Sequence, residues 1–145
     1  DNGERLREGP AIVQYIADQV PDKQLAPANG TLARYRLQEW LTFIGTELHK
    51  GFSPLFNPAT PEDYKPMVRE RLLQRLQWVD SQLAGKQYLM GDQFTVADGY
   101  LFTVTNWTQP TNLDISGLAN LAAYRERVGA RPAVQAAMKA EGLLK

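Results

Sequence analysis

Apolar residues recur every three or four positions through most of this chain, and Pro or Gly interrupts each run. One helical face is marked most clearly by Val68, Leu72, Leu76, Val79 and Leu83. That spacing is the period of an amphipathic α-helix and not the alternation of a half-buried strand. The same pattern predicts a mostly α fold, with helices over residues 10–20, 31–50, 60–84, 95–109, 116–128 and 132–141. Pro66 falls inside the third of these, so we expect either a kink there or a start at Lys65.

The composition disfavours several classes of protein. A chain of 145 residues with 43% hydrophobic residues can bury the core of one domain. Lys plus Arg and Asp plus Glu both number 16, so no charge excess favours a nucleic-acid partner. The absence of Cys removes disulfides, zinc–thiolate sites and a thiol nucleophile from this sequence, and we expect no metal. No apolar run approaches the roughly 18–20 residues of a membrane span. We therefore expect a soluble, cytoplasmic protein without a membrane partner.

The first residues indicate that the sequence starts part-way through a fold. Asp1-Asn2-Gly3 is typical of a turn that joins two antiparallel strands. Residues 4–6 can form one short strand, but its partner would have to precede residue 1. We therefore expect the chain to begin inside a larger fold. Residues 21–30, PDKQLAPANG, have the Pro, Asn and Gly content of a linker.

His49 is the single histidine of the sequence. At about 100° per residue, the apolar residues of the predicted 31–50 helix lie roughly 80–180° away from it. Gln38, Thr42 and Gly45 lie on its own side and are polar or small. Position alone leaves two interpretations open. His49 either faces solvent near the end of a helix and stabilises the helix dipole, or it faces a ligand.

Four segments resemble glutathione transferases. Residues 4–18 read ERLREGPAIVQYIAD and are similar to the end of the family's glutathione-binding, thioredoxin-like domain. Residues 46–56 read TELHKGFSPLF and resemble the signature of the bacterial beta class. Residues 88–102 read YLMGDQFTVADGYLF, which is similar to the family's Gly-Asp, Ser/Thr-x-Ala-Asp segment. Residues 130–143 read ARPAVQAAMKAEGL and look like the family's C-terminal helix.

The resemblance implies a domain organisation. Residues 1–20 would be the last strand and helix of a thioredoxin-like α/β domain, residues 21–29 a linker, and residues 30–145 a helical bundle of the glutathione transferase C-terminal type. The front of the thioredoxin-like domain, which carries the active-site cysteine in the beta class, does not occur in the sequence. We therefore expect the segment alone to be inactive, and the mass of the intact protein would test this expectation.

The resemblance also implies a glutathione site. Glu8 matches the acid that holds the γ-glutamyl ammonium, and Gly9 stands where the family often has serine, so only its backbone N–H could meet a ligand carboxylate. His49 matches the histidine that points at the glutathione sulfur, and Lys50 the cation that reaches the glycyl carboxylate. Thr42 stands where relatives can carry asparagine.

The same resemblance places Phe52, Phe56 and Trp107 at the border of an apolar pocket for the second substrate, where aromatic faces suit flat acceptors. The alternative is that these three residues belong to the core or to an interface. Thr95 and Asp98 have a structural interpretation instead. They are spaced to cap the fourth predicted helix reciprocally, and we expect neither of them to be catalytic.

The implied function is that of a glutathione transferase. The thiol of glutathione, the co-substrate, would attack small hydrophobic electrophiles or reduce peroxides or disulfides, and the protein would be a homodimer. Two alternatives remain open. One is a non-catalytic interaction or ligand-carrying module, and the other is an enzyme of the same fold with another task, such as dehalogenation or disulfide reduction. A cysteine upstream of Asp1 would favour the beta-class enzyme.

Overall fold

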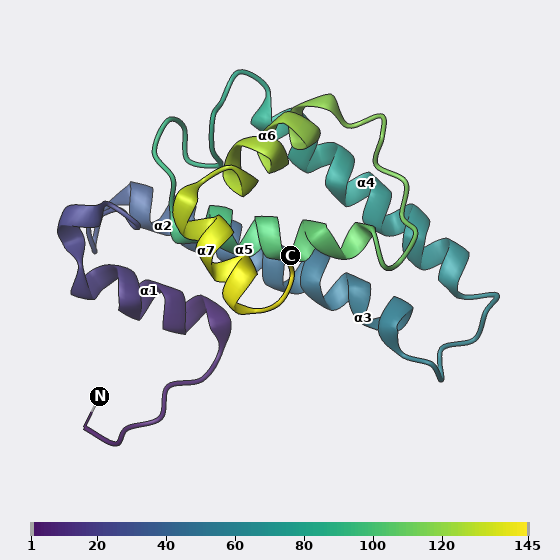
Figure 1. Ribbon diagram of the computed structural model, residues 1–145, viewed down its shortest axis with the longest axis horizontal. Helices are drawn as coiled ribbons and strands as arrows, with labels where there is room; N and C mark the ends of the chain where they lie inside the picture. Colours follow the sequence, from purple (N-terminus) through teal and green to yellow (C-terminus); the bar gives the residue numbers. More distant parts are fainter. Residues whose placement is uncertain (1, 145) are drawn as a thin grey trace.

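Helices form nearly all of the regular structure in the computed structural model, which describes residues 2–144 (Figure 1). The elements are α1 (Gly9–Gln19), η1 (Pro21–Lys23), α2 (Leu32–Phe43), η2 (Ile44–His49), α3 (Lys50–Phe56), α4 (Lys65–Leu83), α5 (Val96–Thr105), η3 (Asn106–Thr108), α6 (Ala119–Gly129) and α7 (Pro132–Ala140). Here η1 and η3 are single 3-10 turns, and η2 is a π-helical segment. The mostly α prediction is confirmed.

The short strand predicted at residues 4–6 is not formed. Within residues 2–144, the strand-like pairing is limited to an isolated antiparallel bridge between Tyr88 and Gly91. A strand needs a hydrogen-bonded neighbour, and no residue of the described range lies beside residues 4–6 to supply one. This segment leads directly into α1, which lies at one side of the bundle (Figure 1).

The second predicted helix does not end at Lys50. The helix of α2 continues through η2 and α3 to Phe56, and the residues at both junctions, Phe43, Ile44, His49 and Lys50, keep right-handed helical backbone angles. Gly51, the residue after the predicted end, has a packing role: a Cβ at this position would lie 2.9 Å from a methyl group of Leu72. The glycine therefore permits close approach of α3 to α4.

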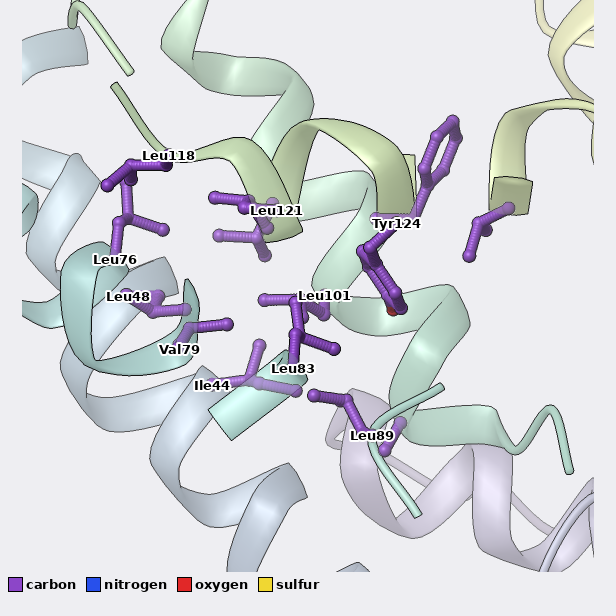
Figure 2. Packing of buried hydrophobic residues seen from close by; sticks show 14 of the residues in the cluster. Ile44, Leu48, Leu76, Val79, Leu83, Leu89, Leu101, Leu118, Leu121 and Tyr124 are labelled. Carbon is purple, nitrogen blue, oxygen red and sulfur yellow. The ribbon is translucent and has the colours of Figure 1, made fainter. Parts of the chain in front are cut away.

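The central core forms between α2–η2, α4, α5 and α6. α4 begins at Lys65, one of the two predicted alternatives, and its whole predicted stripe is buried. Figure 2 shows side chains from these helices converging on one another. The labelled members of this core are Ile44, Leu48, Leu76, Val79, Leu83, Leu89, Leu101, Leu118, Leu121 and Tyr124. Because each fully buried aliphatic side chain contributes about 1.5–3 kcal/mol, this core fixes the helices that carry the site.

Candidate functional site

His49 is the last residue of the π-helical segment and is exposed. Because the helix continues to Phe56, His49 is not near a helix end, and the interpretation based on the helix dipole is wrong. Its imidazole ring meets Trp107 edge-on, with ring centroids 4.8 Å apart and planes at 83°. Its Nδ1 atom lies 2.8 Å from the hydroxyl oxygen of Tyr100. The imidazole is therefore exposed but held by two aromatic neighbours.

An open hollow of about 520 Å³ lies beside this ring. Its lining consists of His49, Ser53, Phe56, Asn57 and Trp107. Phe56 meets Trp107 edge-on at 5.7 Å between ring centroids. The structure thus brings Phe56 and Trp107 together with His49, as the resemblance implied, and the surface they make is mostly apolar.

The prediction that Phe52 borders this pocket is wrong. Phe52 has no exposed surface and belongs to the core. It follows Ile44 and Leu48 at intervals of four residues, which continues the buried stripe of the helix. Its ring packs edge-on against Trp107 at 5.9 Å between centroids. Phe52 supports Trp107 from the core side and does not face the hollow.

Glu8 and Gly9 lie at the start of α1. Glu8 is the residue before the first helical turn and has a φ of 68°, a left-handed conformation that is uncommon for a residue with a side chain. Burial and the negative charge of Glu8 raise the pKa of Tyr100 above its ordinary value. Glu8 is therefore near enough to Tyr100 to influence it electrostatically. This places the start of α1 on the same side of the molecule as the pair formed by Tyr100 and His49.

Lys50 and Thr42 are both exposed but do not line the hollow beside His49. Lys50 lines a separate hollow with Thr46, Glu47 and others on the side of α4, since successive helical residues point about 100° apart. The backbone carbonyl of Thr42 accepts a hydrogen bond from the Thr46 hydroxyl at 3.0 Å. Both residues belong to the continuous helix that carries His49, but neither lines the hollow beside its ring.

Thr95 and Asp98 form the predicted capping box at the start of α5. The Thr95 N–H donates to the Asp98 carboxylate at 2.8 Å, and the Thr95 hydroxyl donates to the same oxygen at 3.1 Å. The other carboxylate oxygen accepts from the Leu89 N–H at 2.9 Å and from the Tyr124 hydroxyl at 3.1 Å. Burial raises the pKa of Asp98, and these four hydrogen bonds oppose that rise. The carboxylate is enclosed by donors of the fold, which confirms its capping role.

Tyr100 is the site residue that the sequence interpretation missed. It lies in α5, 51 residues after His49, so no local motif joins the two. One signal was available, because Tyr100 precedes Trp107 by seven residues, which is close to two helical turns. In the structure both side chains contact His49.

Within residues 2–144, no group of three or more His, Cys, Asp or Glu side chains is arranged to hold a metal ion. None of the helices in that range combines the length and the apolar character that a bilayer crossing requires.

Comparison with known proteins decides the family. The family model described as glutathione S-transferase, C-terminal domain, matches residues 43–132, which is more than half of the chain. The chain belongs to the glutathione S-transferase family. It is 50% identical over 143 residues to the glutathione S-transferase GstA of Escherichia coli O157:H7, an alignment that covers 99% of this chain and 71% of that relative. A Xanthomonas campestris glutathione S-transferase, GST-4.5, is 34% identical over 145 residues, which cover 71% of it.

Solved glutathione S-transferases share the fold closely. The bacterial enzyme BphK, solved as a ternary complex, superposes with a TM-score of 0.96 at 58% identity, over 98% of this chain and 71% of that one. The beta-class enzyme of Sphingomonas chungbukensis superposes with a TM-score of 0.95 at 46% identity, over 99% and 72% of the two chains. A sphingomonad glutathione S-transferase solved with glutathione gives a TM-score of 0.94 at 46% identity, again over 99% and 72%.

Proposed function

We propose that this member of the family is a glutathione transferase of the beta-class type that joins the thiol of glutathione to small hydrophobic electrophiles. The observation that carries the proposal is the exposed imidazole of His49, held between Tyr100 and Trp107 at the edge of an apolar hollow. Relatives that are 50% and 34% identical over nearly the whole chain are named as transferases. Their names do not favour the alternative function, a non-catalytic interaction or ligand-carrying module.

The chemistry requires a thiolate. A free thiol has a pKa near 8.5, so only about 3% of it is ionised at pH 7. Lowering that pKa by about two units would stabilise the anion by roughly 2.7 kcal/mol and raise the reactive fraction about twentyfold. An N–H of His49 is suited to donate to the sulfur, because imidazole carries a donor in both of its protonation states. The thiol proton leaves to solvent.

The sulfur then forms a bond to the electrophilic carbon, and a leaving group such as chloride departs with its bonding electron pair. Phe56 and Trp107 supply apolar surface for a flat acceptor beside the imidazole. The same thiolate can attack one sulfur of a disulfide and release the other as a thiolate, or attack one oxygen of a peroxide and release the other as hydroxide or alkoxide. A second glutathione thiolate then attacks the glutathione sulfur of that product and gives glutathione disulfide, which is the basis of a second, reductive activity. In both cases His49 acts on the sulfur of glutathione.

The rest of the glutathione site extends to the start of α1. Glu8 holds the γ-glutamyl ammonium by charge, and the Gly9 N–H donates to the adjoining carboxylate. Lys50 attracts the glycyl carboxylate from the next face of the helix. Thr42, which precedes His49 by about two helical turns, contributes a hydroxyl. The exposure of all four residues supports this assignment.

The proposal includes an assembly. Residues 1–20 are the end of a thioredoxin-like domain, residues 21–29 its linker, and residues 30–145 the C-terminal domain. The glutathione site is completed by the front of the thioredoxin-like domain, and the protein acts as a cytoplasmic homodimer. The relatives support the part of this proposal that concerns a longer protein, since each extends beyond the region matched by this chain.

The test replaces His49 with Ala in the full-length protein and follows conjugation of glutathione to a nitroaryl chloride. Loss of the donor should lower kcat at least about tenfold, equal to about 1.4 kcal/mol of barrier, and should leave the KM for glutathione within about twofold. Lys50→Ala is the matched control on the same helix and should mainly raise that KM. A His49 variant with a raised KM and unchanged turnover would show that the assigned role is wrong.

A further inference from the structure

Tyr100 and His49 are joined by a hydrogen bond between the phenol hydroxyl and the imidazole ring. The Tyr100 hydroxyl oxygen is 2.8 Å from Nδ1 of His49, a short distance for a bond between an oxygen and a nitrogen. Tyr100 comes from the first turns of α5 and His49 from the π-helical segment, so the bond joins two elements of the rigid core. Its geometry is therefore set by the fold.

The direction of this bond follows from the state of the phenol. Tyr100 is half-buried, and burial together with the charge of Glu8 raises its pKa above the ordinary value of 10.0. The hydroxyl therefore keeps its hydrogen at neutral pH. A neutral imidazole has one nitrogen that donates and one that accepts. When the hydroxyl donates to Nδ1, the ring hydrogen must be on Nε2.

Two further contacts limit rotation of the ring. Trp107 meets the imidazole edge-on with centroids 4.8 Å apart, and Tyr100 does so at 5.8 Å. Gly45 lies one turn before His49 and next to the phenol, since a Cβ there would make an ordinary contact of 3.6 Å with the Tyr100 hydroxyl oxygen. The ring is therefore held on two sides, while the hydroxyl stays within reach of Nδ1.

We propose that Tyr100 is a positioning residue that donates its hydroxyl hydrogen to Nδ1 of His49 and so keeps the neutral imidazole in the Nε2–H form. The consequence for catalysis rests on the proposed function. In this form Nδ1 accepts from Tyr100 and Nε2 carries the ring hydrogen. The Nε2–H group can therefore donate a hydrogen bond to a thiolate. In the other form that nitrogen would present a lone pair to the thiolate and would repel it.

The structural half of the proposal is tested without any substrate. The full-length protein is labelled with ¹⁵N-histidine, and the His49 nitrogens are assigned by their loss in His49→Ala. At about pH 8.5, two units above the ordinary imidazole pKa, the spectrum distinguishes the two neutral forms. The wild type should show Nε2–H. Tyr100→Phe should raise the fraction with the hydrogen on Nδ1 by about two- to tenfold, the effect of one ordinary hydrogen bond.

The control is Tyr35→Phe, which removes the same atom from an exposed tyrosine of α2 and should leave the His49 signals unchanged. Melting temperatures of both variants show that the fold is retained. If Tyr100→Phe leaves the His49 signals in the Nε2–H form at the wild-type ratio, the proposal is overturned.

The catalytic half is tested by kinetics. Tyr100→Phe should lower kcat about five- to tenfold and leave the KM for glutathione within about twofold, because only the presentation of the donor changes. A changed hydrogen position with an unchanged kcat would overturn the catalytic half. A wild-type protein that conjugates no acceptor would instead refute the proposed function, while the spectra would still decide the role of Tyr100 toward His49.

Discussion

Gly9 is the residue at which the proposed glutathione site departs from the serine of the resembling family. It is the first residue of α1, and a Cβ built there meets no atom within 4 Å. Gly9→Ser should therefore fit without strain and add a hydroxyl donor for the ligand carboxylate. One such hydrogen bond contributes about 0.5–1.5 kcal/mol, so the KM for glutathione should fall about two- to tenfold in steady-state assays.

Gly9→Ala is the matched control for this substitution. It adds the same Cβ and the same loss of backbone freedom in the unfolded chain, but it has no hydroxyl. If Ala lowers the KM as much as Ser does, the gain comes from a stiffer helix start, and the proposed contact of residue 9 with the ligand is wrong.

Single residues show where sequence interpretation succeeded and where it failed. His49 could be predicted to lie off the apolar stripe because helical spacing determines the face of each residue. Phe52 was placed at the pocket although its spacing from Leu48 continues that same stripe, and it is buried. Tyr100 was missed because its contact with His49 spans 51 residues, and helical spacing carries no information about such pairs.

At the scale of elements, the second predicted helix was given the wrong end, and it contains a π-helical segment that the sequence pattern did not predict. Ile44–His49 is wider than an α-helix, and π segments of this kind often occur at functional sites. The widening changes which face the following residues present, and a sequence pattern based on 3.6 residues per turn does not register it. The stripe of α4 contains no such segment, and there the prediction of buried residues was correct throughout.

The start of α5 depends on Asp98, whose carboxylate accepts hydrogen bonds from three other residues: Thr95, Leu89 and Tyr124. Asp98→Asn keeps the shape of the side chain but replaces one carboxylate oxygen with an NH2 group. That group would point at N–H or O–H donors from which the oxygen accepts. An unsatisfied buried donor costs about 1–3 kcal/mol, and a weakened cap adds about 0.5–2 kcal/mol. We expect a loss of about 2–4 kcal/mol in the free energy of unfolding at pH 7, measured with urea. A loss under 0.5 kcal/mol would contradict the capping role.

The cost of Asp98→Asn should also depend on pH. Burial raises the pKa of Asp98 in the folded protein above its value of about 3.9 in the unfolded chain. The stability linked to its protonation is therefore fully present below about pH 3.9 and is lost as the pH rises through the folded pKa. The difference between wild type and variant should be larger near pH 4 than at pH 7. A difference that grows with pH would mean that the four hydrogen bonds to the carboxylate outweigh its burial.

At the scale of the whole molecule, the site depends on how α1 is held against the bundle, because Glu8 and Gly9 lie at the start of α1 and the remaining site residues lie on later elements. Arg34 of α2 has a side chain that is 2% exposed, and it pairs with Asp18 of α1. Its guanidinium also donates to the Pro27 carbonyl at 3.0 Å. Gln38 adds a hydrogen bond to Gln14 at 3.1 Å. These bonds join α1 to α2 across the loop between them.

Replacing Asp18 should destabilise the protein more than replacing Arg34, although the two residues form one ion pair. Asp18→Leu leaves the buried guanidinium of Arg34 without its carboxylate, and such a change costs about 3–5 kcal/mol when a charge is fully buried. Since Asp18 is 38% exposed, we expect about 2–4 kcal/mol. Arg34→Met leaves Asp18 beside water and should cost less, about 1–2 kcal/mol. The double variant should resemble Arg34→Met, which gives a coupling energy of about 2–4 kcal/mol in a double-mutant cycle, equal to the cost of Asp18→Leu alone.

The same variants show whether this pairing also aligns the site. Asp18→Leu should raise the KM for glutathione, because a loosened α1 displaces Glu8 from the face that carries Tyr100 and His49, and kcat at saturation should change less. Asp22→Leu removes a neighbouring exposed acid from η1 and should alter neither stability nor KM. If Asp18→Leu destabilises the protein but leaves the KM unchanged, the pair holds the fold together without aligning the two parts of the site.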